Sequence, residues 1–338
     1  MKQIPLFVVG AKGLLAAETM RLALSHPQLH PIHAFSRTAL ADLRDVHPQL
    51  ASSLAVRSLH ELPQALIGAV QNGPTALVFA TPHGVAASMW EGLQKQLKGS
   101  SVDTSELYLI DLSEDHRLKS DGQWSYGLPE LHEISSSVRK VAVAGCFATA
   151  MQLAVIPLQR AQLLDPHSPL ILNGVTASSG SGAVAKQGTH HPYRQSNFHP
   201  YALNGHRHEK ELCHSRNFAM EPQVVFLPYS GPLGRGIYLT AHLSLQGGTT
   251  SNDLQQVFQS AYADQPFIEL IANQAPQLRS VIGSNRAAIG WNQRSDIVQV
   301  FVALDNTIKG GAGQGLQCLN LMLDLPQTTA LPLAGLGY

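Results

Sequence analysis

Cys146 stands where a cysteine can act as a nucleophile. It follows the strand-like run "RKVAVAG" (139–145) and opens the helical pattern "CFATAMQLAV" (146–155). The free N–H groups and the dipole at a helix N-terminus favour a negative charge, so a thiol there loses its proton more readily. A lone cysteine is otherwise usually a small core residue. This position favours the nucleophile, whereas Cys213 and Cys318 lack such a setting and are interpreted as packing residues.

A nucleophilic thiol needs an acid or a base beside it, and histidine is the most frequent choice. The segment "NGHRHEKEL" (204–212) carries His206 and His208, and spacing alone does not decide between them. His190 and His191 form a second candidate pair. The sequence therefore predicts a Cys–His site and leaves the choice of histidine open.

Arg235 begins the strand-like segment "RGIYLTAHLSLQ" (235–246). A guanidinium at such a position can hold a carboxylate or a phosphate through two hydrogen bonds. The polar stretch 178–208 is rich in His, Gly and Ser, and we predict a functional loop there. The 16 histidines form no zinc-finger or zincin motif, so we expect no metal site.

The chain opens with a pattern that is typical of dinucleotide binding. In "LFVVGAKGLLAAET" (6–19) an apolar strand leads through Gly10 and Gly13 into apolar residues at helical spacing. Small residues there let the backbone approach a pyrophosphate on the helix N-terminus. The next strand-like segment ends in Ser36 and Arg37 without an acid, which suits the 2′-phosphate of NADP. We therefore expect NADPH as the cofactor.

Strand-like and helix-like segments alternate through the first half of the chain. This alternation predicts an α/β, Rossmann-type doubly wound nucleotide-binding domain. Strand-like segments separated by long polar loops follow and predict an α+β catalytic domain with a mixed or antiparallel sheet. We expect an NADP-binding domain over residues 1–145, completed by a C-terminal helix at 310–338, and a catalytic and oligomerisation domain over 146–309.

Composition argues against several classes of protein. Among 338 residues, 23 basic residues balance 23 acidic ones, which disfavours nucleic acid or an anionic membrane as the partner. The sequence has no apolar run of membrane-spanning length and no signal-peptide pattern, and its three cysteines are widely spaced. We therefore expect a soluble protein in the reducing cytoplasm. A homo-oligomer, either a dimer or a tetramer, is the default expectation for an enzyme of this size.

Nine motifs along the whole chain occur in the order of a known family. They are "LFVVGAKG", "FATPHGVAA", "DLSEDHRL" with "YGLPEL", "AGCFATAMQLAVIPL", "TASSGSGA", "NGHRHEKEL", "GPLGRGI", "GSNRAAIGW" and "DNTIKGGAGQGLQCLNLM". Together they resemble the N-acetyl-γ-glutamyl-phosphate reductases of arginine biosynthesis, which are relatives of aspartate-semialdehyde dehydrogenase.

The resemblance implies a complete reaction. Cys146 would form a thioacyl-enzyme, with His206 or His208 as the acid or base. NADPH would reduce N-acetyl-γ-glutamyl phosphate, a small-molecule acyl phosphate, to N-acetylglutamate 5-semialdehyde with release of phosphate. The implied substrate-binding residues are Arg117, Ser179 and Arg235. The implied cofactor-binding residues are Gly10, Lys12, Gly13, Ser36, Arg37, Pro82 and Asn306.

The chain also departs from the family pattern. Val143 and Ala144 stand where Asn-Pro usually precedes the Gly-Cys pair, and residues 209–211 replace the usual Thr-Pro-Glu. The acyl group therefore stays open, since a related branch reduces a carrier-linked aminoadipyl phosphate and aspartyl phosphate is a further choice. Two alternatives come from other classes of protein. One is a Cys–His hydrolase or acyltransferase whose glycine turn is only structural, and the other is a catalytically silent nucleotide-sensing protein.

Overall fold

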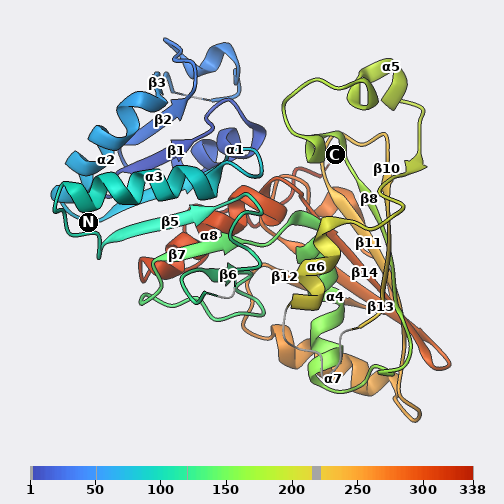
Figure 1. The fold of residues 1–338 in the computed structure, drawn as a ribbon. Helices are drawn as coiled ribbons and strands as arrows, with labels where there is room; N and C mark the ends of the chain where they lie inside the picture. Colours follow the sequence, from blue (N-terminus) through green and yellow to red (C-terminus); the bar gives the residue numbers. More distant parts are fainter. Residues whose placement is uncertain (1–2, 51, 120, 215–221, 338) are drawn as a thin grey trace. The chain divides into compact units, whose positions relative to one another are not determined.

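The computed structural model describes residues 3–50, 52–119, 121–214 and 222–337, and the chain divides into two compact units (Figure 1). The first unit comprises Met1–Ala144 and Gly311–Leu331, and the second comprises Gly145–Gly310 and Pro332–Tyr338. The sequence analysis placed all of 310–338 with the first unit. The last residues lie with the second, where the Leu336 N–H donates to the carbonyl oxygen of Ile282.

The first unit is built on a parallel sheet of seven strands. Their order is β3-β2-β1-β4-β5-β7-β6. After β1 the chain adds β2 and β3 on one side of it and then β4 on the other, so the strand order reverses between β1 and β4. β1, β4 and β5 are buried along their whole length, as expected of parallel strands covered on both faces. The prediction of a doubly wound sheet is thereby confirmed. The strands are β1 (Leu6–Val9), β2 (Ile32–Ser36), β3 (Val56–Ser58), β4 (Thr75–Phe79), β5 (Leu107–Asp111), β6 (Ser125–Gly127) and β7 (Lys140–Val143).

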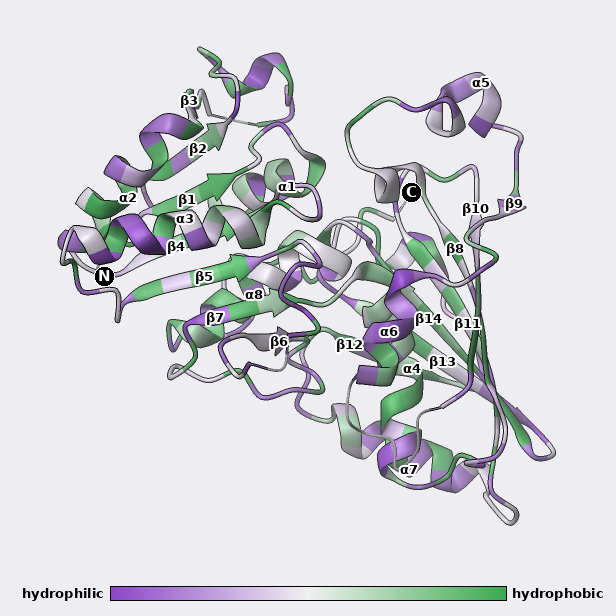
Figure 2. Ribbon diagram, in the orientation of Figure 1, coloured by the Kyte–Doolittle hydropathy of each residue, from purple (hydrophilic) through white to green (hydrophobic). Residues whose placement is uncertain are grey.

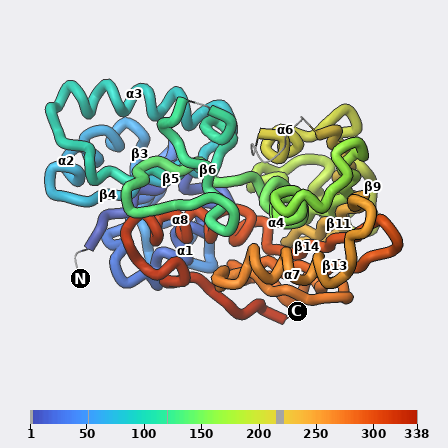
Figure 3. Tube along the Cα trace, turned by 90° about the horizontal axis from the view of Figure 1, so that it is seen from below, coloured from blue at the N-terminus to red at the C-terminus, as the bar shows by residue number. Residues whose placement is uncertain are grey.

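Helices cover both faces of this sheet. α2 and α3 lie on one face, and α1 and the C-terminal α8 lie on the other (Figure 3). α3 alternates between hydrophobic and hydrophilic residues along its length (Figure 2), because only one of its sides faces the sheet. The helices are α1 (Leu14–Ala23), α2 (Leu62–Gln71), α3 (Ala86–Gly99) and α8 (Gly313–Met322).

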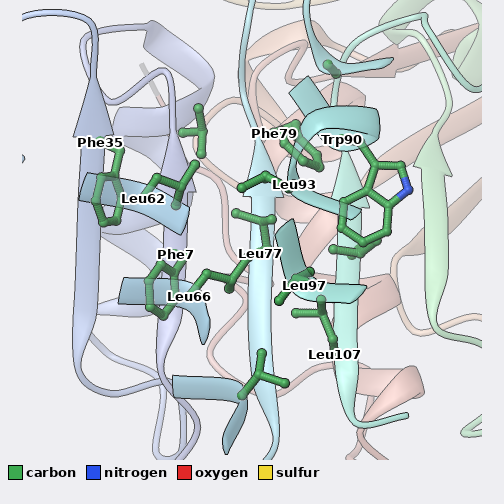
Figure 4. Packing of buried hydrophobic residues seen from close by; sticks show 14 of the residues in the cluster. Phe7, Phe35, Leu62, Leu66, Leu77, Phe79, Trp90, Leu93, Leu97 and Leu107 are labelled. Atoms are coloured by element: carbon green, nitrogen blue, oxygen red, sulfur yellow. The ribbon is translucent and has the colours of Figure 1, made fainter. Parts of the chain in front are cut away.

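The core between the sheet and the helices α2 and α3 consists of large apolar side chains (Figure 4). Alternate residues of the strands point to this face of the sheet. They pack against helix residues that are three or four positions apart, such as Leu62 and Leu66 of α2. This packing holds the carboxyl ends of the strands in a fixed row. The labelled members are Phe7, Phe35, Leu62, Leu66, Leu77, Phe79, Trp90, Leu93, Leu97 and Leu107.

The second unit contains a mixed sheet of seven strands in the order β12-β13-β14-β11-β8-β10-β9. β8 pairs with β10 and β12 with β13 in parallel, and the other neighbours are antiparallel. The prediction of a mixed sheet is confirmed. The strands are β8 (Leu170–Thr176), β9 (His199–Pro200), β10 (Val224–Ser230), β11 (Ile237–Ser244), β12 (Ile268–Ala272), β13 (Ala287–Arg294) and β14 (Ile297–Leu304). The helices are α4 (Cys146–Arg160), α5 (His191–Arg194), α6 (Arg207–His214) and α7 (Ser251–Tyr262).

α4 is the central helix of the second unit, and its residues 147–158 are all buried. Pro157 lies inside it and has no N–H for the carbonyl oxygen of Leu153, one turn earlier. The Tyr262 hydroxyl of α7 donates to that oxygen at 2.7 Å. The proline is therefore accommodated without an unpaired buried carbonyl, and α7 is fixed to α4.

Gly10 is expected to be intolerant of any side chain. Its φ is +88°, and a β-carbon there would stand 2.4 Å from the carbonyl oxygen of Ala80. Gly10→Ala should lower the free energy of unfolding by about 1–3 kcal/mol because it combines left-handed backbone with a clash. Gly68 in α2 has open space around its Cα, so Gly68→Ala should stabilise the helix by roughly 0.5–1 kcal/mol. Urea unfolding of both variants checks this, and equal midpoints would contradict it.

Candidate active site

Cys146 is the first residue of α4 and is partly exposed. Gly145, which follows β7, has an extended backbone and is the N-cap residue of α4. The Thr149 N–H donates to the Gly145 carbonyl at 2.7 Å, which is the first hydrogen bond of the helix. The N–H groups of the first turn have no intrahelical acceptor and together with the dipole favour an anion at this end. The predicted strand-to-helix position of Cys146 is therefore observed.

Gly145 lets α6 lie directly against this helix end. A β-carbon on Gly145 would stand 2.4 Å from Nε2 of His208 and 2.7 Å from Oε1 of Glu211. The other carboxylate oxygen of Glu211 accepts the Gly145 N–H at 3.0 Å, and Oε1 lies 3.8 Å from His208 Nε2. Both side chains are buried. Glu211 thus joins the residue before the thiol to one histidine, a role the sequence analysis did not assign.

A second glycine, Gly310, packs directly against Cys146. A β-carbon on Gly310 would stand 2.7 Å from Cβ of Cys146. Gly310 belongs to a π-helical turn, Ile308–Ala312, that the buried Asp305 organises. The Asp305 carboxylate accepts the N–H groups of Thr307 and Ile308, and its carbonyl accepts that of Gly310. This turn therefore sets how closely the chain approaches the cysteine.

His206 is a neutral imidazole with a defined tautomer. Burial, and to a lesser extent the charge of Arg207, lower the pKa of His206 to about 4. Its Nδ1 accepts the backbone N–H of His208 at 3.2 Å, so the ring proton lies on Nε2. The ring also packs edge-on against Phe147, Tyr201 and His208. His206 can consequently donate a hydrogen bond but does not carry a charge at neutral pH.

Tyr201 belongs to the site, although the sequence analysis did not select it. Burial first, and the charge of Cys146 second, raise the pKa of Tyr201 to about 12. The phenol therefore stays protonated close to the cysteine and can donate a hydrogen bond. A tyrosine in a loop gives no motif by itself, and only the fold brings it here.

These side chains surround a cavity of about 390 Å³ within the second unit. The predicted functional loop supplies much of its wall, although neither His190 nor His191 lines it. Among the described residues no aspartate or glutamate lines it, whereas three basic side chains do. The cavity therefore suits an anionic ligand. Its lining residues are Cys146, Phe147, Thr176, Gly180, Ser181, Lys186, Gly188, Thr189, Arg194, His199, Tyr201, His206, Arg207, His208 and Ser230.

Three residues predicted to bind ligands hold neighbouring loops instead of lining this cavity. Arg235 Nε pairs with Asp305 at 3.1 Å. The Asn306 side-chain oxygen accepts the Ser179 hydroxyl at 3.0 Å and the Gly236 N–H at 2.7 Å. Arg235, Asn306 and Ser179 thereby fix the loops that follow β8 and precede β11. Ligand contacts of these residues stay a prediction.

Arg117 lies in the first unit and is buried. Its Nε donates to the carbonyl of Val143 at 2.7 Å, and Nη2 donates to that of Leu112 at 3.1 Å. It therefore joins the carboxyl ends of β5 and β7. Its predicted role in substrate binding stays a prediction.

The glycine turn of the first unit fits a dinucleotide. Gly10 and Gly13 lie between β1 and α1, and no β-carbon covers the backbone next to Ala80 at the end of β4. The buried hydroxyl of Thr81 has no hydrogen-bond partner in the described part of the chain, as expected of a group that awaits a ligand. This is the edge, at the reversal of strand order, where doubly wound sheets bind nucleotides.

The remaining predicted cofactor residues lie at the same edge. Arg37 is exposed just beyond β2, and Ser36 donates its hydroxyl to the carbonyl of Thr38 at 2.5 Å. Lys12 lies within the glycine turn, and Pro82 is exposed after β4. These four residues and the two glycines therefore come from the ends of three adjacent strands, β2, β1 and β4.

Within the described ranges, no group of three or more His, Cys, Asp or Glu side chains is placed to hold a metal ion. No helix in the same part of the chain combines the length and the apolar character that a membrane crossing requires.

Family models match both units. Residues 6–137 match the "Semialdehyde dehydrogenase, NAD binding domain", and residues 146–306 match the "Semialdehyde dehydrogenase, dimerisation domain". The fold is similar to that of aspartate semialdehyde dehydrogenase II from Vibrio cholerae, with a TM-score of 0.71 and 15% identity over 96% of this chain and 99% of that one. The enzyme from Candida albicans, solved with NADP, gives a TM-score of 0.62 and 14% identity over 95% and 99%.

Relatives at higher identity narrow the class. A chain from Pseudomonas putida named N-acetyl-gamma-glutamyl-phosphate reductase 1 is 33% identical over 97% of this chain and 98% of its own length. One from Stenotrophomonas maltophilia with the same enzyme name is 35% identical over 96% and 97%. One from Thermomicrobium roseum, named as a LysW-L-2-aminoadipate 6-phosphate reductase, is 33% identical over 97% of both chains.

The fold, the thiol at a helix N-terminus and the two matched domains define the class, an oxidoreductase of the semialdehyde dehydrogenase type. Within that class, the chain belongs to the N-acetyl-γ-glutamyl-phosphate reductase family.

The lowered pKa of His206 predicts a pH dependence of stability. Unfolding restores its ordinary pKa of about 6.5, so between that value and about 4 the unfolded state binds more protons than the folded one. The free energy of unfolding should therefore fall as pH decreases through this window. His206→Gln should lose less stability than the wild type between about pH 7.5 and about pH 5 in urea unfolding. His60→Gln, at an exposed position, is the control, and an unchanged pH response in His206→Gln would contradict the assignment.

Proposed function

We propose that the protein reduces N-acetyl-γ-glutamyl phosphate with NADPH to N-acetylglutamate 5-semialdehyde, with release of phosphate, through a thioacyl intermediate on Cys146. The observation that carries the proposal is the placement of this thiol at the N-terminus of α4, in a cavity with basic and aromatic walls. The names of relatives along nearly the whole chain support the substrate. The expected setting is the cytoplasm.

Cys146 would carry out the covalent steps. Its thiolate sulfur attacks the carbonyl carbon of the acyl phosphate, the carbon–oxygen bond to phosphate breaks, and a thioester forms. NADPH, when bound, supplies the hydride that reduces this thioester. The carbon–sulfur bond then breaks, the aldehyde leaves and the thiolate returns. The helix N-terminus stabilises the thiolate in its first and last states.

His208 is the histidine we assign to proton transfer. Its Nε2 lies against Gly145, next to the thiol, and the Glu211 carboxylate lies near enough to orient it. In this position the imidazole can hold or move a proton at Nε2 beside the reacting carbon. His206 is less suited because its Nδ1 is occupied by the His208 N–H and its pKa of about 4 keeps it neutral. His206 and Tyr201 instead supply hydrogen-bond donors to the cavity.

NADPH would bind at the glycine turn of the first unit. The N-terminus of α1 behind Gly13 provides amides for the pyrophosphate, and the hydroxyl of Thr81 is open to a partner. Arg37 beyond β2 is available for the 2′-phosphate, since neither Ser36 nor Arg37 repels it. Lys12 and Pro82 would border the same site.

A homo-oligomer is part of the proposal. The second unit matches a domain described as a dimerisation domain. The apolar side chains of Ile171 and Val225 pair across β8 and β10 and are 42% and 47% exposed. A second copy of the chain that covered this sheet face would remove them from water.

The reverse reaction tests the proposed function most directly. N-acetylglutamate semialdehyde, phosphate and NADP⁺ should yield NADPH, followed by its absorbance, only when all three are present. Aspartate semialdehyde and the carrier-linked aminoadipate semialdehyde are run in parallel. Turnover of the carrier-linked aldehyde alone would replace the substrate by that of the Thermomicrobium relative. NADPH formation from none of the three would overturn the proposal.

Cys146→Ser should abolish turnover by several orders of magnitude, because a hydroxyl is a far poorer nucleophile than a thiolate at neutral pH. NADPH binding, measured by fluorescence, should be retained. Cys213→Ser, which changes a thiol outside the cavity lining, should stay active. Near-native turnover of Cys146→Ser would exclude covalent catalysis through this residue.

Arg37→Ala should weaken NADPH binding by about 10- to 100-fold, because a hydrogen bond to a charged group contributes about 1.5–3 kcal/mol. NADH binding should change little, since NADH lacks the 2′-phosphate. Titration of each nucleotide into wild type and variant measures the effect. An equal loss for both nucleotides would mean that Arg37 does not bind the 2′-phosphate.

A further inference from the structure

Arg194 brings a positive charge into the buried part of the Cys146 cavity. It ends α5, lines the cavity and is 7% exposed. Its Nη1 donates to the Ser230 hydroxyl at 2.6 Å, and Nη2 donates to the Thr176 carbonyl at 3.0 Å. These acceptors, at the ends of the paired strands β10 and β8, fix the guanidinium but carry no charge.

The charge of Arg194 has no counter-ion within the described residues. Its Nε is buried without a hydrogen-bond partner, and no carboxylate in this part of the chain pairs with it. Burial lowers the pKa of Arg194, yet a guanidinium stays protonated at neutral pH. A buried ion without a partner is destabilising, so such an arrangement is typical of a site whose counter-ion arrives with the ligand.

The acyl phosphate of the proposed function carries two anionic groups. The phosphoryl group leaves in every turnover, whereas the carboxylate at the other end of the glutamyl chain stays unchanged. The other two cations in the cavity lining, Lys186 and Arg207, are exposed, and therefore suit a group that exchanges with water. The fixed, buried and planar guanidinium suits the retained carboxylate, whose two oxygens match its N–H groups.

We propose that Arg194 binds the α-carboxylate of the substrate through its buried guanidinium and so makes a free carboxylate a requirement for the reaction at Cys146. This inference rests on the proposed function and specifies how its site recognises the substrate. The carboxylate would supply the acceptor that Nε of Arg194 lacks. The hydrogen bonds to Ser230 and Thr176 hold the guanidinium in place. An analogue with a carboxamide at this position would leave the buried charge unpaired.

The test compares two aldehydes in wild type and Arg194→Gln. They are N-acetylglutamate semialdehyde and its α-carboxamide, each with phosphate and NADP⁺. The wild type should prefer the carboxylate by about 100-fold in kcat/KM, as expected when a buried charge loses its partner. Arg194→Gln should lose most of this preference through a higher KM for the carboxylate aldehyde. Its KM for phosphate should be unchanged.

Controls separate the different failures. Arg294→Gln removes an exposed arginine at the end of β13 and should keep the preference. If Arg194→Gln does not fold, Arg194→Lys is used, because it keeps the charge without the planar guanidinium. Its kcat/KM preference for the carboxylate aldehyde should be at least about tenfold smaller than that of the wild type. A preserved preference in the folded variant overturns this inference and leaves the proposed function standing. A raised KM for phosphate, with an unchanged KM for the aldehyde, would assign Arg194 to phosphate binding and would also overturn the inference. A wild type that turns over no N-acetylglutamate semialdehyde overturns the proposed function and this inference with it.

Discussion

The site depends on how closely the backbone approaches the N-terminus of α4. Gly145 precedes Cys146 and Gly310 packs against its side chain, and a β-carbon on either glycine would stand less than 3 Å from groups of the site. Without Gly145, His208 and Glu211 could not lie beside the thiol. Without Gly310, the turn that Asp305 organises could not close over it. The position of Cys146 is therefore set by these close contacts.

Electrostatics follows from this packing. The open N–H groups of the helix end, the basic side chains of the cavity and the absence of acidic lining residues in the described part of the chain all favour negative charge at one place. The carboxylates of Glu211 and Glu209 come near the site, and they accept the backbone N–H groups of Gly145 and His206 respectively. The second unit therefore has a cavity suited to an anionic ligand, with Cys146 in its lining. Neutral His206 and Tyr201 add hydrogen-bond donors without adding charge.

The departures from the family pattern have physical counterparts in the structure. Glu209 follows the second histidine and accepts the backbone N–H of His206 at 2.5 Å, as the acidic residue of a capping box does. Ala144, in place of the usual proline, donates its N–H to the carbonyl of Gly127 at 3.2 Å, a bond that a proline could not form. Both substituted residues thus form backbone hydrogen bonds of their own. The contacts of Glu211 with Gly145 and His208 are present beside them.

Much of the molecule was determined by local sequence. The alternation of strands and helices, the glycine turn after β1 and the cysteine at a helix start can all be read from short segments, because each depends on neighbouring residues. Only the tertiary structure selected among distant candidates. It brought Tyr201 and Arg194 to the Cys146 cavity and Gly310 against Cys146, paired Arg235 with Asp305, and gave His206 and His208 different surroundings. These relations depend on burial and on contacts between residues far apart in the chain, for which no short pattern gives a signal.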